Sequence, residues 1–195
     1  MSQHSVGILA FDNAEVLDVM GPFEVFSVAG RISKPSKFEV NLISDRRDSL
    51  ANLRHGLEIK TDYSINSAPN FDLLIVAGGV TTEAEKNLDL LTWLQGRASK
   101  VENLASICTG AFILAQAGII TNQEVTTHWE DQEELSQRFP ELKVLPNERW
   151  VQSGNIYTSG GISAGIDLSL HLVEKIAGRN LAERTATQME YKWND

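Results

Sequence analysis

Three side chains with acid, base or nucleophilic chemistry stand out in the sequence, namely Asp18, Cys108 and His128. Cys108 is the only cysteine among the 195 residues, and small residues surround it in the stretch SICTGAF. A lone cysteine often serves only as a small buried hydrophobic residue. Whether this thiol is reactive therefore depends on the elements that position it and on the groups beside it.

The residues around Cys108 predict a turn from strand to helix. A short buried strand is expected at 103–107, and a helix is expected at 109–118, ending at Gly118. Such a turn, a nucleophile elbow, projects its central side chain from the carboxyl edge of the sheet, where ligands bind in open α/β folds. It also places the thiol beside free N–H groups of a helix start. We therefore expect a nucleophilic Cys108 with a lowered pKa, and Gly110 suits close backbone packing there.

A second loop offers backbone donors for negative charge that develops on a substrate. The glycine pair in VAGGV ends a predicted strand at 71–79, so the N–H groups of Gly79 and Val80 are expected at the same sheet edge as Cys108. The N–H of Thr109 would complete this oxyanion pocket. Glycine pairs after strands also occur as simple turns, and no phosphate-binding or dinucleotide-binding glycine motif is present.

Asp18 and His128 are the candidates for acid and base roles. Asp18 stands among apolar residues in EVLDVMGP, where burial would favour a protonated carboxyl, although an exposed helix position or cap fits the local pattern equally well. His128 in VTTHW fits a base near Cys108, and the simpler interpretation is a histidine with satisfied hydrogen bonds. No CxxC or HExxH spacing occurs, so no metal site is expected. Asp167 is a possible partner for a nearby loop.

Short apolar runs alternate with longer segments of helical period along the chain, which is typical of an α/β fold with a mostly parallel sheet flanked by helices. Two hairpins are expected, at 50–63 with its turn at His55-Gly56 and at 149–161 with its turn around Gly154. The remaining strands are predicted at 5–11, 37–44, 71–79, 103–107 and 125–129. Helices are predicted at 15–30, with an interruption at Gly21-Pro22, and at 85–100, 109–118, 129–140, 163–178 and 181–193.

Composition narrows the class of protein further. The chain is 42% hydrophobic, which suits one core, and we expect residues 1–195 to form a single domain. A net charge of -9 argues against nucleic-acid binding and favours small molecules or copies of the same chain as partners. The N-terminus lacks the pattern of a signal peptide, and no run approaches the roughly 18 to 20 apolar residues that span a bilayer. A cytoplasmic protein without membrane association is therefore predicted.

Four stretches, in this order and at these distances, resemble the ThiJ/PfpI superfamily, which shares the flavodoxin-like fold of class I glutamine amidotransferases. They are GILAFDNAEVLDVMGPFEVF, VAGG, SICTGAFILAQAGIITNQEVTTHW and TSGGISAGIDLSLHLVEKIAG. The similarity is strongest to the isonitrile hydratase branch and to the ligand-sensing domains of AraC-type regulators. It runs over nearly the whole chain and supports the nucleophile elbow at Cys108.

The resemblance implies a reaction as well as a fold. An isonitrile would be hydrated to an N-substituted formamide without a cofactor, with Cys108 as nucleophile and Asp18 as the acid that protonates carbon and then activates water. Thr109 follows the nucleophile as in the hydratases, and Gly79 matches the backbone-donor loop. The superfamily also commonly forms homodimers. Apolar residues that would suit such an interface, or equally the core, are Pro22, Phe23 and Phe26.

Departures from the wider superfamily leave alternatives open. Protease-like members carry histidine directly after the nucleophile, and Thr109 at this position disfavours peptide cleavage. The AraC-type relatives continue into a helix-turn-helix domain, which we do not expect in this chain. A non-catalytic small-molecule sensor and a thiol-based stress-response protein are the alternatives to the hydratase.

Overall fold

The computed structural model describes residues 3–35 and 37–194. Within them, seven strands form one sheet in the order β10-β11-β7-β6-β1-β2-β5, and each neighbouring pair is parallel except β10 with β11. The α/β fold with a mostly parallel sheet is thus confirmed. The strands are β1 (His4–Ala10), β2 (Phe38–Ser44), β5 (Tyr63–Ser64), β6 (Leu73–Val76), β7 (Asn103–Ile107), β10 (Trp150–Ser153) and β11 (Ile156–Ser159).

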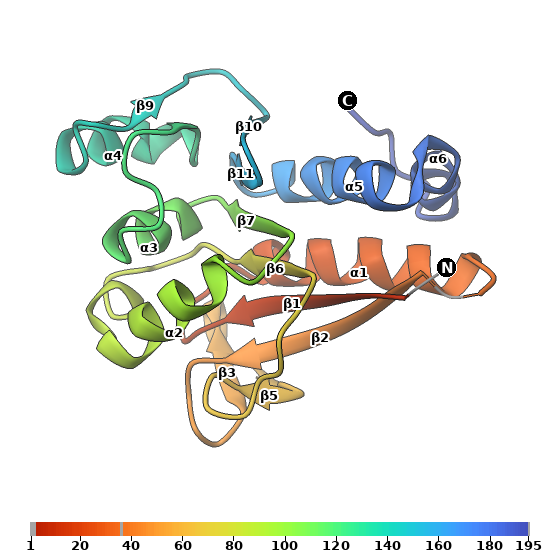
Figure 1. The fold of residues 1–195 in the computed structure, drawn as a ribbon, viewed down its shortest axis with the longest axis horizontal. Coiled ribbons are helices and arrows are strands. Elements are labelled where there is room, and N and C mark those ends of the chain that lie inside the picture. The colour runs from red at the N-terminus through yellow and green to blue at the C-terminus, as the bar shows by residue number, and fades with distance from the viewer. Residues whose placement is uncertain (1–2, 36, 195) are drawn as a thin grey trace.

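Helices cover the sheet, and their packing explains why its central strands are apolar. Every residue of β6 and β7 is buried, as expected for parallel strands covered on both faces. Helices α1, α5 and α6 pack against one another, whereas α2 packs on α3, which lies against β6 and β7 (Figure 1). The helices are α1 (Val16–Ile32), α2 (Leu88–Ala98), α3 (Gly110–Gln116), α4 (Gln132–Arg138), α5 (Ala164–Ala177) and α6 (Arg179–Gln188).

Helix α1 differs from the prediction, because it runs without interruption through Gly21 and Pro22. Both residues are buried, and a Cβ added to Gly21 would lie 3.1 Å from Cγ1 of Ile166 in α5. The helix thus packs closely against α5 at the point where Pro22 removes one backbone hydrogen bond. Phe26 is fully buried and Phe23 packs against the core, so the apolar face considered for dimerisation points inward.

The smaller elements confirm both predicted hairpins. Strands β3 (Leu50–Leu53) and β4 (Leu57–Lys60) are antiparallel, and the turn between them is η1 (Arg54–Gly56), where His55 has a φ of 61°. Strands β10 and β11 form the second hairpin. The remaining elements are β8 (Glu124–Val125), β9 (Lys143–Val144), η2 (Ala84–Lys86) and η3 (Trp129–Asp131).

Three predicted boundaries near the site and the C-terminus were wrong. The strand expected at 125–129 is limited to β8, since Thr126 and Thr127 instead bond side chains and carbonyls of neighbouring loops. The helix expected at 129–140 begins as the turn η3 and continues as α4. The last helix ends at Gln188 instead of at residue 193. Glu190 has a φ of 50°, which a right-handed helix does not allow.

Candidate active site

Cys108 occupies the turn between β7 and α3, as the sequence predicted. Its φ of 54° lies in the left-handed region, which costs a non-glycine residue free energy and persists only where neighbours fix it. The N–H of Cys108 donates to Ser159 O at 3.1 Å, and its carbonyl accepts from Thr127 Oγ1 at 2.8 Å. A Cβ added to Gly110 would lie 2.5 Å from Val76 O, so the turn also requires glycine there. These contacts hold the thiol in one place.

Asp18 lies in the first turn of α1 and is completely buried. Neither carboxyl oxygen forms a hydrogen bond of regular geometry with the described residues, and the Cys108 thiol and the Gly78 N–H face it. Burial, with a smaller contribution from the charge of Glu15, raises the pKa of Asp18 to about 7, although the thiol and the Gly78 N–H oppose this shift. The carboxyl can therefore exchange a proton near neutral pH.

The pKa of Cys108 departs from the prediction, which was wrong in direction. Burial raises the pKa of the thiol, and the neighbouring Asp18 raises it further. The N–H and hydroxyl of Thr109 act in the opposite direction but are outweighed. The helix start alone suggested a thiolate, whereas the buried carboxyl beside the thiol disfavours a second negative charge. The resting thiol is neutral and needs a base when it attacks.

Two of the three backbone donors expected in the oxyanion pocket, the N–H groups of Gly79 and Val80, already donate hydrogen bonds within the protein. The Gly79 N–H donates to Thr109 Oγ1 at 2.8 Å, and the Thr109 hydroxyl donates back to Gly79 O at 2.8 Å. The Val80 N–H donates to Asn13 O at 3.1 Å. Of the three expected donors, only the N–H of Thr109 faces the sulfur.

The glycine pair instead separates the elbow from the start of α1. A Cβ added to Gly78 would lie 2.6 Å from the Thr109 nitrogen and 2.8 Å from Cys108 Cβ. A Cβ added to Gly79 would lie 2.5 Å from the nitrogen of Glu15, whose N–H donates to Gly78 O at 2.8 Å. The pair therefore sets the spacing between the elbow, which carries Cys108, and the helix that carries Asp18.

His128 lies beside the thiol. A Cβ added to Gly161 would lie 2.5 Å from Cys108 Sγ and 2.8 Å from Nδ1 of His128, so the sulfur and the ring both contact this glycine. Nδ1 is buried and has no hydrogen-bond partner in the described chain, while Nε2 lies 3.5 Å from Glu130 Oε2. The interpretation of His128 as a histidine with satisfied hydrogen bonds therefore does not hold for Nδ1.

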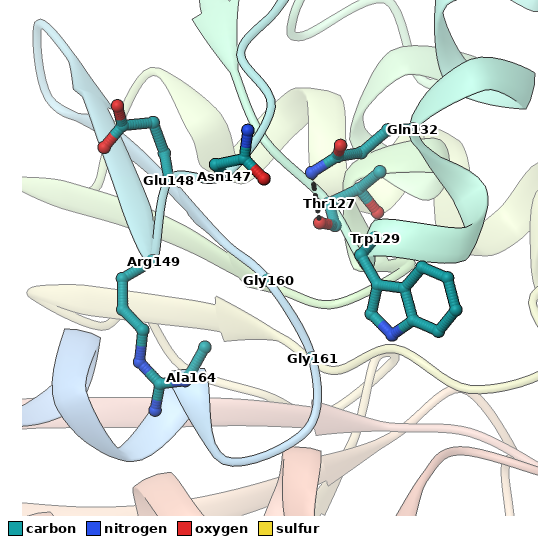
Figure 2. A pocket seen from close by; sticks show the side chains of 9 residues that line it. All are labelled: Thr127, Trp129, Gln132, Asn147, Glu148, Arg149, Gly160, Gly161 and Ala164. Carbon is teal, nitrogen blue, oxygen red and sulfur yellow. Dashed lines mark hydrogen bonds between the residues drawn. The ribbon is translucent and has the colours of Figure 1, made fainter.

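Two small cavities lie on either side of this centre. The Trp129 cavity, about 180 Å³, is bounded by residues that include Trp129, Arg149, Gly160 and Gly161. Figure 2 shows the indole of Trp129 across this cavity from Arg149, with the Gly160–Gly161 backbone running between them. Because Gly161 also contacts the sulfur, one stretch of backbone stands between this cavity and Cys108.

The second cavity lies on the Thr109 side. This Asp131 cavity is also about 180 Å³, and its lining includes Gly79, Thr109, Asp131 and Arg138. The turn η3 contributes Trp129 to one cavity and Asp131 to the other. It follows His128 directly, so the segment from His128 to Asp131 forms one boundary of the centre.

Sequence reasoning missed two residues that hold the centre together. Thr127 donates to the carbonyl of Cys108, and Gly161 contacts the thiol. The signal for Gly161 was present in the sequence, because TSGG repeats the pattern of a glycine pair after a strand. The partner expected for Asp167 is Arg149, whose Nε donates to it at 2.7 Å from the loop before β10.

In residues 3–35 and 37–194, no three His, Cys, Asp or Glu side chains gather where they would hold a metal ion. None of the helices in the same ranges is long and apolar enough to cross a membrane.

The model of the DJ-1/PfpI family matches residues 4–175. The chain belongs to this family. It is 31% identical over 191 residues to the isonitrile hydratase of Pseudomonas putida, which covers 95% of this chain and 78% of the relative. It is 29% identical over 189 residues to the HTH-type transcriptional regulator GbdR of Pseudomonas aeruginosa; here 96% of this chain matches only 51% of the regulator.

Solved structures of the family confirm the fold. A ThiJ/PfpI family protein from Pseudomonas syringae superposes with a TM-score of 0.86 at 23% identity, covering 100% of this chain and 78% of that one. Drosophila melanogaster DJ-1beta gives the same TM-score of 0.86 at 18% identity, covering 98% of this chain and 100% of that one. These superpositions confirm the fold, and the match of the family model to residues 4–175 confirms the family resemblance predicted from the four stretches.

Proposed function

We propose that the protein is a cysteine-dependent hydratase that converts an isonitrile, R–NC, and water to an N-substituted formamide. The observation that carries the proposal is that the Cys108 thiol faces the Asp18 carboxyl in a nearly closed site, since Cys108 is 6% exposed and Asp18 is fully buried. The similarity to an isonitrile hydratase over 95% of this chain supports this choice of reaction.

The first half of the reaction forms a covalent intermediate. The sulfur of Cys108 attacks the terminal carbon of the isonitrile, and the thiol proton passes to the Asp18 carboxylate as the S–C bond forms. Asp18 then gives this proton to the same carbon. The product is a thioimidate, R–N=CH–S–Cys, which contains every atom of the substrate. A carboxyl with a pKa of about 7 suits both transfers, because it accepts and returns a proton near neutral pH.

The second half releases the product and restores the thiol. Asp18, again a carboxylate, takes one proton from water as the oxygen adds to the thioimidate carbon, and this proton ends on the substrate nitrogen. The resulting R–NH–CH(OH)–S–Cys then loses its C–S bond. The sulfur leaves with the remaining hydroxyl proton, so the products are R–NH–CHO and the neutral thiol with which the cycle began.

Two neighbours are assigned supporting roles. The N–H of Thr109 faces the sulfur and stabilises negative charge on it during attack and departure. Nδ1 of His128 has no hydrogen-bond partner among the residues that the structure describes, and it contacts the same glycine as the sulfur, so we assign it to hydrogen-bonding the substrate nitrogen.

A sensor is the second candidate. The similarity to a transcriptional regulator, which covers 96% of this chain, supports it. A sensor would bind a small molecule in the same place without hydrating it. A homodimer and a cytoplasmic location stay predictions from the resemblance and the composition.

A turnover assay separates these candidates. Purified protein is incubated with cyclohexyl, benzyl and tert-butyl isonitrile, and formamide is measured by chromatography. We expect turnover by the wild type, none by Cys108→Ala or Asp18→Asn, and unchanged turnover by Asp89→Asn, which alters an exposed aspartate in the first turn of α2. Absence of formamide from all three isonitriles, in protein whose thiol can be alkylated, would refute the hydratase.

A further inference from the structure

The Asp131 cavity is placed to receive part of a substrate bound at Cys108. It is lined by Thr109, the residue directly after the nucleophile, and by Gly79, which is hydrogen-bonded to Thr109. The Trp129 cavity lies instead behind the backbone of Gly161. A substituent that extends from the reacting carbon past Thr109 therefore enters the Asp131 cavity.

Among the described residues that line this cavity, Arg138 is the only cation, and it is already paired with two carboxylates. Arg138 donates to Glu85 Oε2 and, at 3.1 Å, to Glu134 Oε1, and its guanidinium lies 5.1 Å from the centre of the Phe112 ring. The other oxygen of Glu85 accepts from the Thr81 hydroxyl at 2.6 Å. Two carboxylates therefore already balance the charge of Arg138, which weakens its attraction for an anionic ligand.

Asp131 is the carboxylate of this cavity that remains without such a partner. It forms no ion pair with a lysine or arginine within the described ranges. Burial and the neighbouring carboxylates Glu134 and Glu130 raise the pKa of Asp131, and its interaction with His128 opposes this shift. The lining of the cavity carries more negative than positive charge, because it includes three carboxylates and one guanidinium. These are Asp131, Glu85, Glu134 and Arg138. The excess lies in a partly enclosed space, where charges are screened less than at the open surface.

We propose that the Asp131 cavity holds the substituent of the isonitrile, and that Asp131 selects cationic or hydrogen-bond-donating substituents over anionic ones. This inference rests on the proposed hydratase function for its substrate. The recognition chemistry is that of a carboxylate with an ammonium group. A substituent that carries its own carboxylate is disfavoured, because it would place a further negative charge beside Asp131 with Arg138 already occupied.

The first test compares two small isonitriles of opposite charge, 3-(dimethylamino)propyl isonitrile and isocyanoacetate. We expect kcat/KM of the wild type to favour the cationic compound. Asp131→Asn should reduce this preference by about tenfold, the effect of ~1.4 kcal/mol. Glu148→Gln, which alters the other cavity, and Glu133→Gln, exposed on α4, remove the same charge elsewhere and should leave the preference unchanged. An equal loss in either control overturns the proposal.

The second test does not depend on hydratase activity. Cys108, the only cysteine, is modified with methanethiosulfonates bearing a trimethylammonium or a sulfonate group, and rates are normalised to those of 2-mercaptoethanol. We expect the cationic reagent to react faster, and Asp131→Asn or higher salt to reduce the difference. If this charge preference is found but no isonitrile is turned over, the hydratase function is refuted, whereas the assignment of Asp131 as the group that selects ligand charge in this cavity stands. An unchanged ratio in Asp131→Asn, or no reaction with either reagent, overturns the assignment.

Discussion

The Thr109 hydroxyl and the backbone of Gly79 are joined by two hydrogen bonds, each 2.8 Å long, one donated by each residue. This double contact fixes the loop after β6 to the elbow. Since Gly78 contacts Cys108 on one side and accepts from Glu15 at the start of α1 on the other, the contact also determines how closely Asp18 approaches the thiol. Thr109 thus acts in part as a positioning residue.

Replacing Thr109 tests this positioning role. Thr109→Val removes both hydrogen bonds at similar volume, and we expect a loss of about 1–3 kcal/mol in unfolding free energy together with lower kcat. The apparent pKa in the pH–rate profile should also move, because the spacing of Asp18 and the thiol changes. Thr109→Ser should restore the unfolding free energy, kcat and the apparent pKa. Thr92→Val, on the exposed side of α2, should change none of these quantities. Normal kcat and pH profile in Thr109→Val would argue against positioning.

The buried carboxyl of Asp18 makes stability depend on pH. Its pKa is about 7 in the folded protein and near 3.8 in the unfolded chain. Between these two pH values the folded state therefore keeps a proton that the unfolded state has lost. The stability it provides is complete below pH 3.8 and is lost as the pH rises to 7, a difference of about 4 kcal/mol. Asp18→Asn stays neutral throughout.

Urea unfolding at several pH values measures this effect. Asp18→Asn and the wild type should be about equally stable near pH 4, and the variant should be more stable at pH 8 by up to about 4 kcal/mol. Asp89→Asn serves as the exposed control. The same difference at both pH values would show that Asp18 does not titrate near neutrality.

Alkylation of Cys108 tests the raised pKa of its thiol. Because burial and Asp18 both raise this pKa, the rate of reaction with iodoacetamide in the wild type should still be increasing above pH 9. Asp18→Asn removes the neighbouring charge, so its profile should shift to lower pH. A rate that levels off below pH 8 in the wild type would instead support the lowered pKa suggested by the helix start.

Gly161 offers a steric test with a neighbouring control. A Cβ at position 161 would lie 2.5 Å from Cys108 Sγ, whereas the nearest atoms to a Cβ at Gly160 are 3.7 Å away. Gly161→Ala should therefore displace the thiol, lower turnover at least tenfold and cost about 1–3 kcal/mol of stability, as overpacking does. Gly160→Ala should be near wild type in both assays. Equal effects of the two changes would contradict the close contact.

Much of the fold could be predicted from the sequence because local pattern decided it. The mainly apolar runs before Gly78 and Cys108 predicted buried strands that end at the same edge of the sheet, and small residues around Cys108 predicted the elbow. Long-range packing decided the rest. Helix α1 continues through Gly21 and Pro22 where it packs closely on α5, and the contact of Gly21 with Ile166 joins residues far apart in the chain.

The chemistry of the site was less accessible to sequence reasoning. That Asp18 meets Cys108 was implied by resemblance alone, since ninety residues separate them in the chain. The Val80 N–H was expected to be free, and only the fold places Asn13 O within its reach. The pKa of Cys108 was predicted in the wrong direction because burial beside a carboxyl is a property of the assembled structure.

Intact-protein mass spectrometry of a quenched reaction tests the covalent mechanism most directly. Wild-type protein mixed with benzyl isonitrile and quenched in acid before the first turnover is complete should gain the mass of one isonitrile, and peptide mapping should place it on Cys108. Cys108→Ala should gain no mass and form no formamide. Formamide production by Cys108→Ala, or by wild type that never carries the adduct, would contradict covalent catalysis by this cysteine.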